Sequence, residues 1–280
     1  MDTKKVWYIT GASKGLGLAL AKKLLSEGYR VAATSRTAEQ LKNAVGSANE
    51  DQFLALEVDL TSDESIKQSI QNTQAHFGQL DVVVNNAGYG IGGSIEELLQ
   101  EDVYNNFNVN VFATIKVIHH ALPVMRAQRS GHIINISSIG GFAGATGWSV
   151  YAATKFAITG MTEVLAEEVR ALGIKVTVVA PGGFRTEFLS AESLVMAENT
   201  INDYQAIRDS HAKYNTMNGK QAGDPDRAAE VFIVLAENPE PPVRLFLGSD
   251  AYARASAKIT QLGNDLEQWK DLTLSTDFPG

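Results

Sequence analysis

The chain has 280 residues, of which 44% are hydrophobic, and its formal net charge is -8. A chain of this length can bury one large core, so we expect a single domain spanning residues 1–280. The negative charge opposes nucleic-acid phosphates and anionic membranes, and neither is expected as a partner. The absence of cysteine excludes disulfides, thiolate nucleophiles and cysteine-ligated metal centres.

Two features predict a cytoplasmic location. The amino terminus leads directly into a short apolar segment, without the long apolar region and small-residue cleavage site of a secretory signal. The longest uncharged run, from His132 to Thr154, is rich in Gly, Ser and Asn, which make it a poor membrane span.

Short β-branched segments alternate with longer amphipathic ones along the chain. The strand segments are 6–10, 30–35, 53–58, 80–85, 132–137, 175–180 and 243–247. Helical periodicity occurs at 16–27, 64–76, 101–129, 150–172 and 225–236. Several strands are apolar on both faces, as expected for parallel strands covered by helices on both sides. The sequence therefore predicts an α/β fold with a doubly wound, Rossmann-type sheet of seven parallel strands.

Two segments depart from this alternation. Residues 186–223 are polar, mixed in charge and show no strand pattern. We expect a mostly helical insertion that acts as a substrate-binding lid, because ligands bind beyond the carboxyl ends of the strands in such sheets. A solvated helical hairpin without ligand contact is the alternative. Residues 248–280 are expected to form a C-terminal helical extension.

A glycine-rich turn joins the first predicted strand to the first predicted helix. Its sequence is Thr-Gly-Ala-Ser-Lys-Gly-Leu-Gly, residues 10–17. Glycines allow a sharp turn close to a pyrophosphate, and the helix start offers unpaired N–H groups. We expect a dinucleotide phosphate here, although such a turn can also be purely structural. The glycine spacing is G-x-x-x-G-x-G, not the G-x-G-x-x-G of the standard fingerprint.

Three further motifs follow this turn in a fixed order. They are Asn85-Asn86-Ala87-Gly88, Ser138 thirteen residues before Tyr151-Ala-Ala-Thr-Lys155, and Pro181-Gly182 with Thr186. Together with the turn they resemble the classical short-chain dehydrogenases/reductases, in particular NADP-preferring carbonyl (keto) reductases, over residues 4 to about 247. The resemblance implies the strand order 3-2-1-4-5-6-7 and transfer of the pro-S hydride of the nicotinamide.

The end of the second strand predicts the cofactor. An arginine there accommodates the 2′-phosphate of NADP, whereas an acidic residue would bind the ribose of NAD. The chain has Ser35-Arg36 at this point, and Lys14 adds a second cation, so we expect NADP(H). The alternative is that both cations are merely solvated.

The resemblance completes the set of cofactor contacts, with Asp59 and Leu60 against the adenine and Thr186 near the carboxamide. The expected cofactor-binding residues are Gly11, Ser13, Lys14, Gly15, Leu16, Gly17, Ser35, Arg36, Asp59, Leu60, Asn86, Ala87, Gly88, Tyr151, Lys155, Pro181, Gly182, Phe184 and Thr186.

Tyr151 and Lys155 are the candidates for proton transfer, since residues four apart share a helix face. A free tyrosine, with a pKa of about 10, is too weak an acid at neutrality, and Lys155 and the positive nicotinamide ring of NADP⁺ would together lower that pKa. We expect Ser138 to hold the substrate carbonyl beside Tyr151, with Ser137 as a rival. The resemblance adds Asn110, which would bind a water linking Lys155 to solvent.

Apolar residues near this site are candidates for the substrate pocket, with core packing as the alternative. They are Phe142, Trp148, Phe188 and Met196, beside Ser138. We expect no metal, because the adjacent His119 and His120 point about 100° apart on a helix and no third ligand is suitably spaced.

The sequence thus predicts reversible reduction of a ketone or aldehyde by NADPH. The alternatives are an NADPH-binding redox sensor without turnover, and a nucleotide-sugar epimerase or dehydratase of the extended type. The resemblance implies pairing through the helices that follow the fourth and fifth strands. We expect a homodimer in which the C-terminal extension covers the edge used by tetrameric relatives, and a tetramer stays open.

Overall fold

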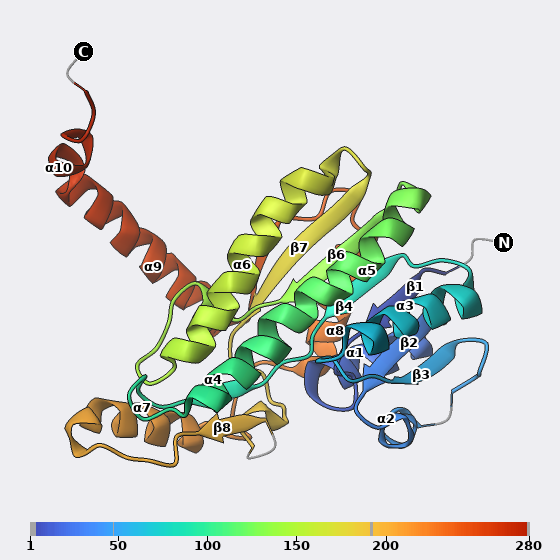
Figure 1. Ribbon diagram of the computed structural model, residues 1–280, viewed down its shortest axis with the longest axis horizontal. Coiled ribbons are helices and arrows are strands. Elements are labelled where there is room, and N and C mark those ends of the chain that lie inside the picture. Colours follow the sequence, from blue (N-terminus) through green and yellow to red (C-terminus); the bar gives the residue numbers. More distant parts are fainter. Residues whose placement is uncertain (1–3, 47, 191–192, 279–280) are drawn as a thin grey trace.

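The computed structural model of the protein describes residues 4–46, 48–190 and 193–278 (Figure 1). Its centre is a parallel seven-stranded sheet with the order β3-β2-β1-β4-β6-β7-β9. The strands are β1 (Val6–Ile9), β2 (Arg30–Ser35), β3 (Phe53–Glu57), β4 (Val82–Asn85), β6 (Gly131–Ile136), β7 (Ile174–Pro181) and β9 (Arg244–Leu247). All seven predicted strands, the strand order and the fold class are confirmed.

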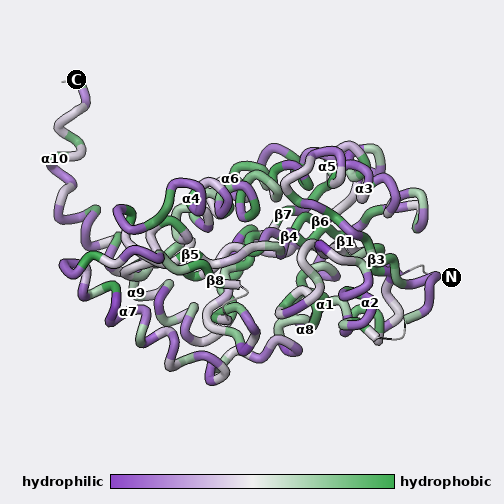
Figure 2. The backbone as a smooth tube through the Cα atoms, turned by 60° about the horizontal axis from the view of Figure 1, so that its bottom comes forward, coloured by the Kyte–Doolittle hydropathy of each residue, from purple (hydrophilic) through white to green (hydrophobic). Residues whose placement is uncertain are grey.

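Helices cover both faces of the sheet (Figure 2). They are α1 (Gly15–Ser26), α2 (Ala38–Val45) and α8 (Pro225–Glu237) on one side, and α3 (Asp63–Phe77), α5 (Ala113–Gln128) and α6 (Ser149–Arg170) on the other. Along β1, Trp7 and Ile9 pack towards α1 and α8, whereas Val6 and Tyr8 pack towards α3, α5 and α6. Two-sided burial explains why the strands are apolar throughout.

The predicted helix 101–129 is interrupted. It consists of α4 (Gln100–Phe107), a π-helical turn (Asn108–Phe112) and α5. The hydrophobic periodicity continues through the interruption, so the pattern alone predicted one helix. Single π-helical turns inside α-helices are frequent at functional sites.

The segment 186–223 contains more than the expected helices. Besides α7 (Gln205–Thr216) it holds the short strand β8 (Leu194–Met196), which pairs in parallel with β5 (Gly90–Gly92) in a separate two-stranded sheet. The prediction of no strand here was wrong, because three residues are too few to show an alternation. Residues 191–192 lie outside the described chain.

The C-terminal extension is helical, as α9 (Ser249–Gln268) and α10 (Lys270–Leu274). Ala251 and Ala255 at its start are buried in a cluster with Ile139, against which Phe246 of β9 also packs. The rest projects away from the body (Figure 1). The extension was expected to cover the edge of the sheet, but only the first turns of α9 lie against it. Within the described ranges, no helix is long and apolar enough to cross a lipid bilayer.

Two residues of α8 test the packing of this helix on the sheet. Phe232 is 2% exposed and Val234 is 66% exposed. We expect Phe232→Ala to lower the free energy of unfolding by about 3–5 kcal/mol, because it removes a large buried ring and leaves a cavity. Val234→Ala should change it by less than about 0.5 kcal/mol. Equal shifts of the urea-unfolding midpoint for the two variants would contradict this packing.

Candidate active site

One cavity of about 1020 Å³ opens beyond the carboxyl ends of the strands. The strand order reverses between β1 and β4, which is where ligands bind in doubly wound sheets. The turn 11–16 forms one end of the cavity, and the segments after β4 and β6 form its floor. The start of α6 and one face of α7 form the other end.

The glycine-rich turn presents the start of α1 to this cavity. Gly11 and Gly15 have φ values of 64° and 59°, in the left-handed region that favours glycine. Helix α1 begins without a side-chain cap and without an acidic residue in its first turn. Its first N–H groups and the positive end of its dipole are therefore suited to an anion.

Gly17 was expected to contact the cofactor, but the structure gives it a packing role. It does not line the cavity, and a Cβ there would lie 2.5 Å from Asn86 Nδ2 and 2.7 Å from Gly11 O. The glycine thus lets Asn86 approach the turn, where its amide donates hydrogen bonds of 2.9 Å to Thr10 O and Gly11 O. Gly17 and Asn86 together fix the shape of the glycine-rich turn.

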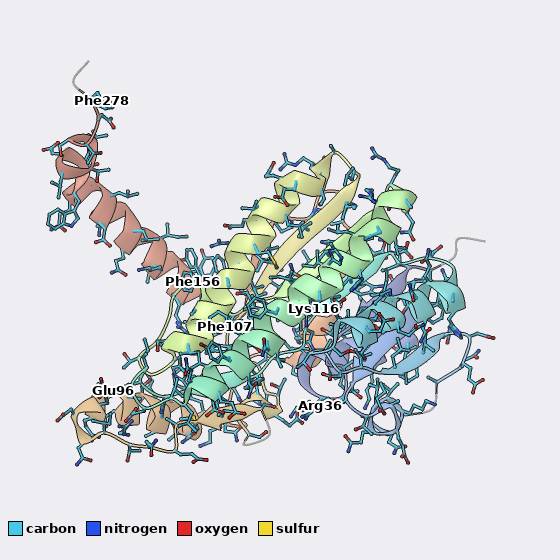
Figure 3. All side chains as sticks on the ribbon, in the orientation of Figure 1. Arg36, Glu96, Phe107, Lys116, Phe156 and Phe278 are labelled. Carbon is cyan, nitrogen blue, oxygen red and sulfur yellow. The ribbon has the colours of Figure 1, made fainter. Side chains whose placement is uncertain are left out.

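The ends of β2 and β3 form the outer part of the cavity. Arg36 is exposed at its mouth (Figure 3). Ser35 Oγ donates to Thr37 O at 2.6 Å, so this hydroxyl shapes the turn that presents Arg36. Asp59 accepts hydrogen bonds from the hydroxyl and the N–H of Thr61, which lower the pKa of Asp59.

Ser138, Tyr151 and Lys155 all reach the cavity. Lys155 Nζ donates to Ile136 O at 3.0 Å and lies 5.8 Å from the centre of the Tyr151 ring. The rival Ser137 donates to Lys155 O at 2.8 Å and is 2.9 Å from the hydroxyl of Thr159, so its hydroxyl is engaged in the core. Ser138 is therefore the serine that is available to a ligand beside Tyr151.

Burial controls the proton affinities of this group. It raises the pKa of Tyr151 to about 12, against the opposing effect of a hydrogen bond with Ser138. It also lowers the pKa of Lys155 to about 8. Desolvation of the phenolate outweighs any lowering of the tyrosine pKa by Lys155, whose amine is directed at Ile136 O. The joint lowering expected from Lys155 and the nicotinamide ring of NADP⁺ stays a prediction. With this raised pKa, Tyr151 keeps its proton at neutral pH.

Asn110 lies in the π-helical turn, behind the cavity wall and 1% exposed. Its amide donates to Tyr89 O at 3.0 Å and to Thr154 Oγ1 at 3.2 Å, and its oxygen accepts from Tyr89 N at 3.0 Å. The side chain thereby ties the segment after β4 to α6. The water expected at Asn110 stays a prediction.

Two of the expected pocket residues line the inner cavity and two do not. Trp148 and Phe188 do, with the Phe188 ring 5.8 Å from that of Tyr151. Phe142 instead packs against Phe246 at 5.1 Å, beside the start of α9. Met196 is on β8 with its sulfur close over a glycine of β5. The hydrophobicity of these residues was visible in the sequence, but the faces on which they lie were not.

Sequence reasoning missed the contribution of α7 and α9. Three residues of α7 and the residue that directly follows it line the cavity at helical spacing, namely Ser210, Lys213, Tyr214 and Met217. That helical spacing was visible in the sequence and could have indicated one shared face of the helix. Asp250 and Arg254, one turn apart on α9, and the buried Gln221 also line it. Among the described residues, Gln221 Oε1 has no hydrogen-bond partner.

An ion pair fastens the start of α7 to the body. Glu97 is 2% exposed and pairs with Arg208 of α7. It also accepts hydrogen bonds from Ile201 N at 2.7 Å and Ser94 N at 3.0 Å. Arg208 above all, with these N–H groups, lowers the pKa of Glu97 to about 2.

The part of the chain that carries the glycine-rich turn, Ser138, Tyr151 and Lys155 matches a known protein family. Residues 5–194 match the model of the family described as short chain dehydrogenase. The chain belongs to this family. As a short-chain dehydrogenase it is an oxidoreductase.

Similar proteins match almost the whole chain. Oxidoreductase BOA17 of Botryotinia fuckeliana (strain B05.10) is 36% identical over 97% of this chain and 99% of its own. The crystal structure of a short-chain dehydrogenase from Streptomyces avermitilis is 34% identical with a TM-score of 0.89, over 98% of this chain and 100% of its own. The structure of ElxO with NADP bound is 32% identical with a TM-score of 0.72, over 87% of this chain and 96% of its own.

The Glu97–Arg208 pair predicts a pH-dependent stability. Because the pKa of Glu97 in the folded chain lies below its ordinary value of 4.5, the ionised carboxylate stabilises the fold above pH 4.5. This contribution is lost as the pH falls from 4.5 towards about 2. We expect Glu97→Gln to unfold at lower urea concentration than wild type at pH 7, with the difference shrinking through that window.

Glu168→Gln, at an exposed position of α6, serves as the control and should follow wild type at every pH. A gap between Glu97→Gln and wild type that stayed constant down to pH 2 would rule out the assigned ionisation.

Proposed function

We propose that this chain is an NADP(H)-dependent carbonyl reductase that converts a ketone or aldehyde into an alcohol. The observation that carries the proposal is the convergence of Ser138, Tyr151 and Lys155 in the cavity that also receives the start of α1. A pure NADPH sensor has no chemical need for this group.

The residues at the other end of the cavity fit a dinucleotide. The turn 11–16 and the uncapped start of α1 would hold the pyrophosphate, since they offer N–H groups and no negative charge. Arg36 would bind the 2′-phosphate, for which a charge-assisted hydrogen bond is well suited. The NADP bound by ElxO supports this assignment. When bound, NADPH supplies the hydride that the reduction consumes.

The chain's own residues would position the substrate and move the proton. Ser138 Oγ would donate a hydrogen bond to the carbonyl oxygen and hold it beside Tyr151. As that oxygen gains negative charge, Tyr151 Oη would transfer its proton to it and complete the alcohol. Lys155, 5.8 Å from the ring, would hold the nicotinamide ribose and stabilise the phenolate left behind.

The walls beyond Tyr151 favour a medium-sized, mainly apolar carbonyl compound. Trp148, Phe188, Tyr214 and Met217 line this part, and the Trp148 and Tyr214 rings are 5.2 Å apart. The segment 186–223 supplies most of these residues and would act as a lid, anchored by Glu97. We further propose a cytoplasmic homodimer that pairs through α5 and α6, with a tetramer as the larger alternative.

Replacing the phenol tests the proton donor. We expect Tyr151→Phe to lower the rate of NADPH oxidation with a reactive ketone by about 10²–10⁴-fold, because the general acid is removed while the ring remains. NADPH affinity, measured by fluorescence titration, should change by less than about threefold, which is under 1 kcal/mol. Tyr214 lines the same cavity, so Tyr214→Phe is the control and should retain most of the rate. A fully active Tyr151→Phe would refute the assignment.

Replacing Arg36 tests the cofactor preference. We expect Arg36→Ala to raise the KM for NADPH by about 10–100-fold, because a hydrogen bond to a charged group contributes about 1.5–3 kcal/mol. The KM for NADH should stay near that of wild type, since NADH has no 2′-phosphate. Lys42→Ala, at an exposed position of α2 outside the cavity, is the matched control. Equal effects of Arg36→Ala on both cofactors would contradict a 2′-phosphate contact.

A further inference from the structure

The C-terminal arm, residues 256–278, has little contact with the rest of the described chain. It comprises the free part of α9, all of α10 and the residues up to Phe278, which Figure 3 places at its far end. Four large apolar side chains are exposed on the arm's part of α9 and at the residue directly after it. They are Ile259 (57%), Leu262 (42%), Leu266 (72%) and Trp269 (56%).

These four residues continue the face by which α9 packs on the body. Ala251 and Ala255 are buried against the cluster around Ile139. The next positions on that face are residues 259, 262, 266 and 269, at alternating spacings of four and three. This spacing forms the apolar seam of paired helices. The helix therefore carries a face built for burial beyond the point where its own body ends.

An isolated helix of this length is marginal in water, and a contiguous exposed apolar patch marks an interaction surface. A membrane surface does not fit the arm. The charged residues of the arm are Lys258, Lys270, Asp265, Glu267, Asp271 and Asp277, an excess of negative charge. Helices that bind anionic lipid are rich in Lys and Arg instead.

We propose that the arm pairs with the arm of a second copy of this chain, in antiparallel orientation. The seam is self-complementary about its midpoint at Asn264. In that register Leu262 faces Leu266 of the second copy, and Ile259 faces Trp269 of the second copy. Every member of the seam is covered, as a symmetric dimer requires. Gly263 flanks the midpoint with no atom within 4 Å of a Cβ built there, which leaves room for close approach.

A second exposed apolar face supports a second copy as the occupant. Phe112 and Ile115 at the start of α5, and Phe156 and Val164 of α6, are large apolar residues left exposed. Phe156 lies near the base of the arm in Figure 3, and in Figure 2 the arm ends on the side of the sheet covered by α5 and α6. The arm and this second face therefore lie on the same side of the sheet, and the arm adds a contact to the proposed pairing through α5 and α6.

The arm is shared with relatives. The solved Streptomyces avermitilis chain matches 98% of this one, which leaves only a few residues unmatched, so the similarity extends into the arm. A segment kept at this length in a separate protein, with so little contact to its own body, is consistent with a contact between copies.

The test is the dissociation constant of the dimer, measured by sedimentation equilibrium on the full chain. Leu262→Glu with Leu266→Glu places two charges in the seam, and we expect the dissociation constant to rise at least a hundredfold. Asn264→Glu with Gln268→Glu adds the same charge at the same spacing on the opposite face and should change it less than threefold. Ketone reduction at saturating NADPH should be unchanged in both variants, which shows that they fold.

A second readout is the fluorescence of Trp269, the one exposed tryptophan of the described chain. Trp7 and Trp148 are buried, so iodide quenching reports chiefly on Trp269. We expect quenching to decrease as protein concentration rises through the dissociation constant, and not to change in the Leu262→Glu, Leu266→Glu variant. A monomeric wild type, equal dissociation constants for the two double variants, or quenching independent of concentration would each overturn the proposal. Binding of the arm to vesicles with no self-association would assign it to a membrane instead.

Discussion

The hydrogen bond from Lys155 Nζ to Ile136 O is the contact on which the geometry of the site depends. It joins α6 to the last residue of β6. Ile136 lies two residues before Ser138, and Lys155 lies one helical turn after Tyr151. A buried amine is costly unless it is hydrogen-bonded, so this contact restricts where α6 can lie on the sheet. Gly88 keeps the space open, since a Cβ there would lie 3.4 Å from the amine and 3.0 Å from Asn110 Oδ1.

The same burial gives the site its chemical character. Desolvation holds Tyr151 in its protonated form and brings the pKa of Lys155 down to about 8. The phenol keeps its proton beside the Ser138 hydroxyl. The proposed transfer of that proton to a reduced carbonyl oxygen requires the positive charges of Lys155 and of the oxidised nicotinamide to lower the pKa. The opposite end of the cavity is electrostatically different, with an uncapped helix start and Arg36. The cavity thus has one end suited to an anion and another end that carries Ser138, Tyr151 and Lys155, joined by the segment after β4.

The parts of the fold that depend on local pattern could be predicted from the sequence. Strands buried on two faces leave long apolar runs, and the motifs of the site follow the ends of β1, β4, β6 and β7 directly. Features that depend on tertiary packing could not be predicted. The π-helical turn at Asn110 does not disturb the hydrophobic periodicity, and the strands β5 and β8 have three residues each.

The pKa of Tyr151 depends on how much water the folded site excludes, which a spacing of four residues does not reveal. The lining role of α7 was visible as helical spacing, but only once the direction of that helix was known. Phe142 and Met196 show the same limit, since their hydrophobicity fits either a pocket or a core.

In the proposed reaction, the reducing hydrogen passes directly from NADPH to a carbonyl carbon held between Ser138 and Tyr151. The most direct measurement is reduction of a ketone with NADPH that carries deuterium at the pro-S position, followed by mass spectrometry of the alcohol. We expect one deuterium on the carbinol carbon, and none when the label is at the pro-R position. Unlabelled alcohol from both cofactors, or oxidation of NADPH without any alcohol, would contradict it.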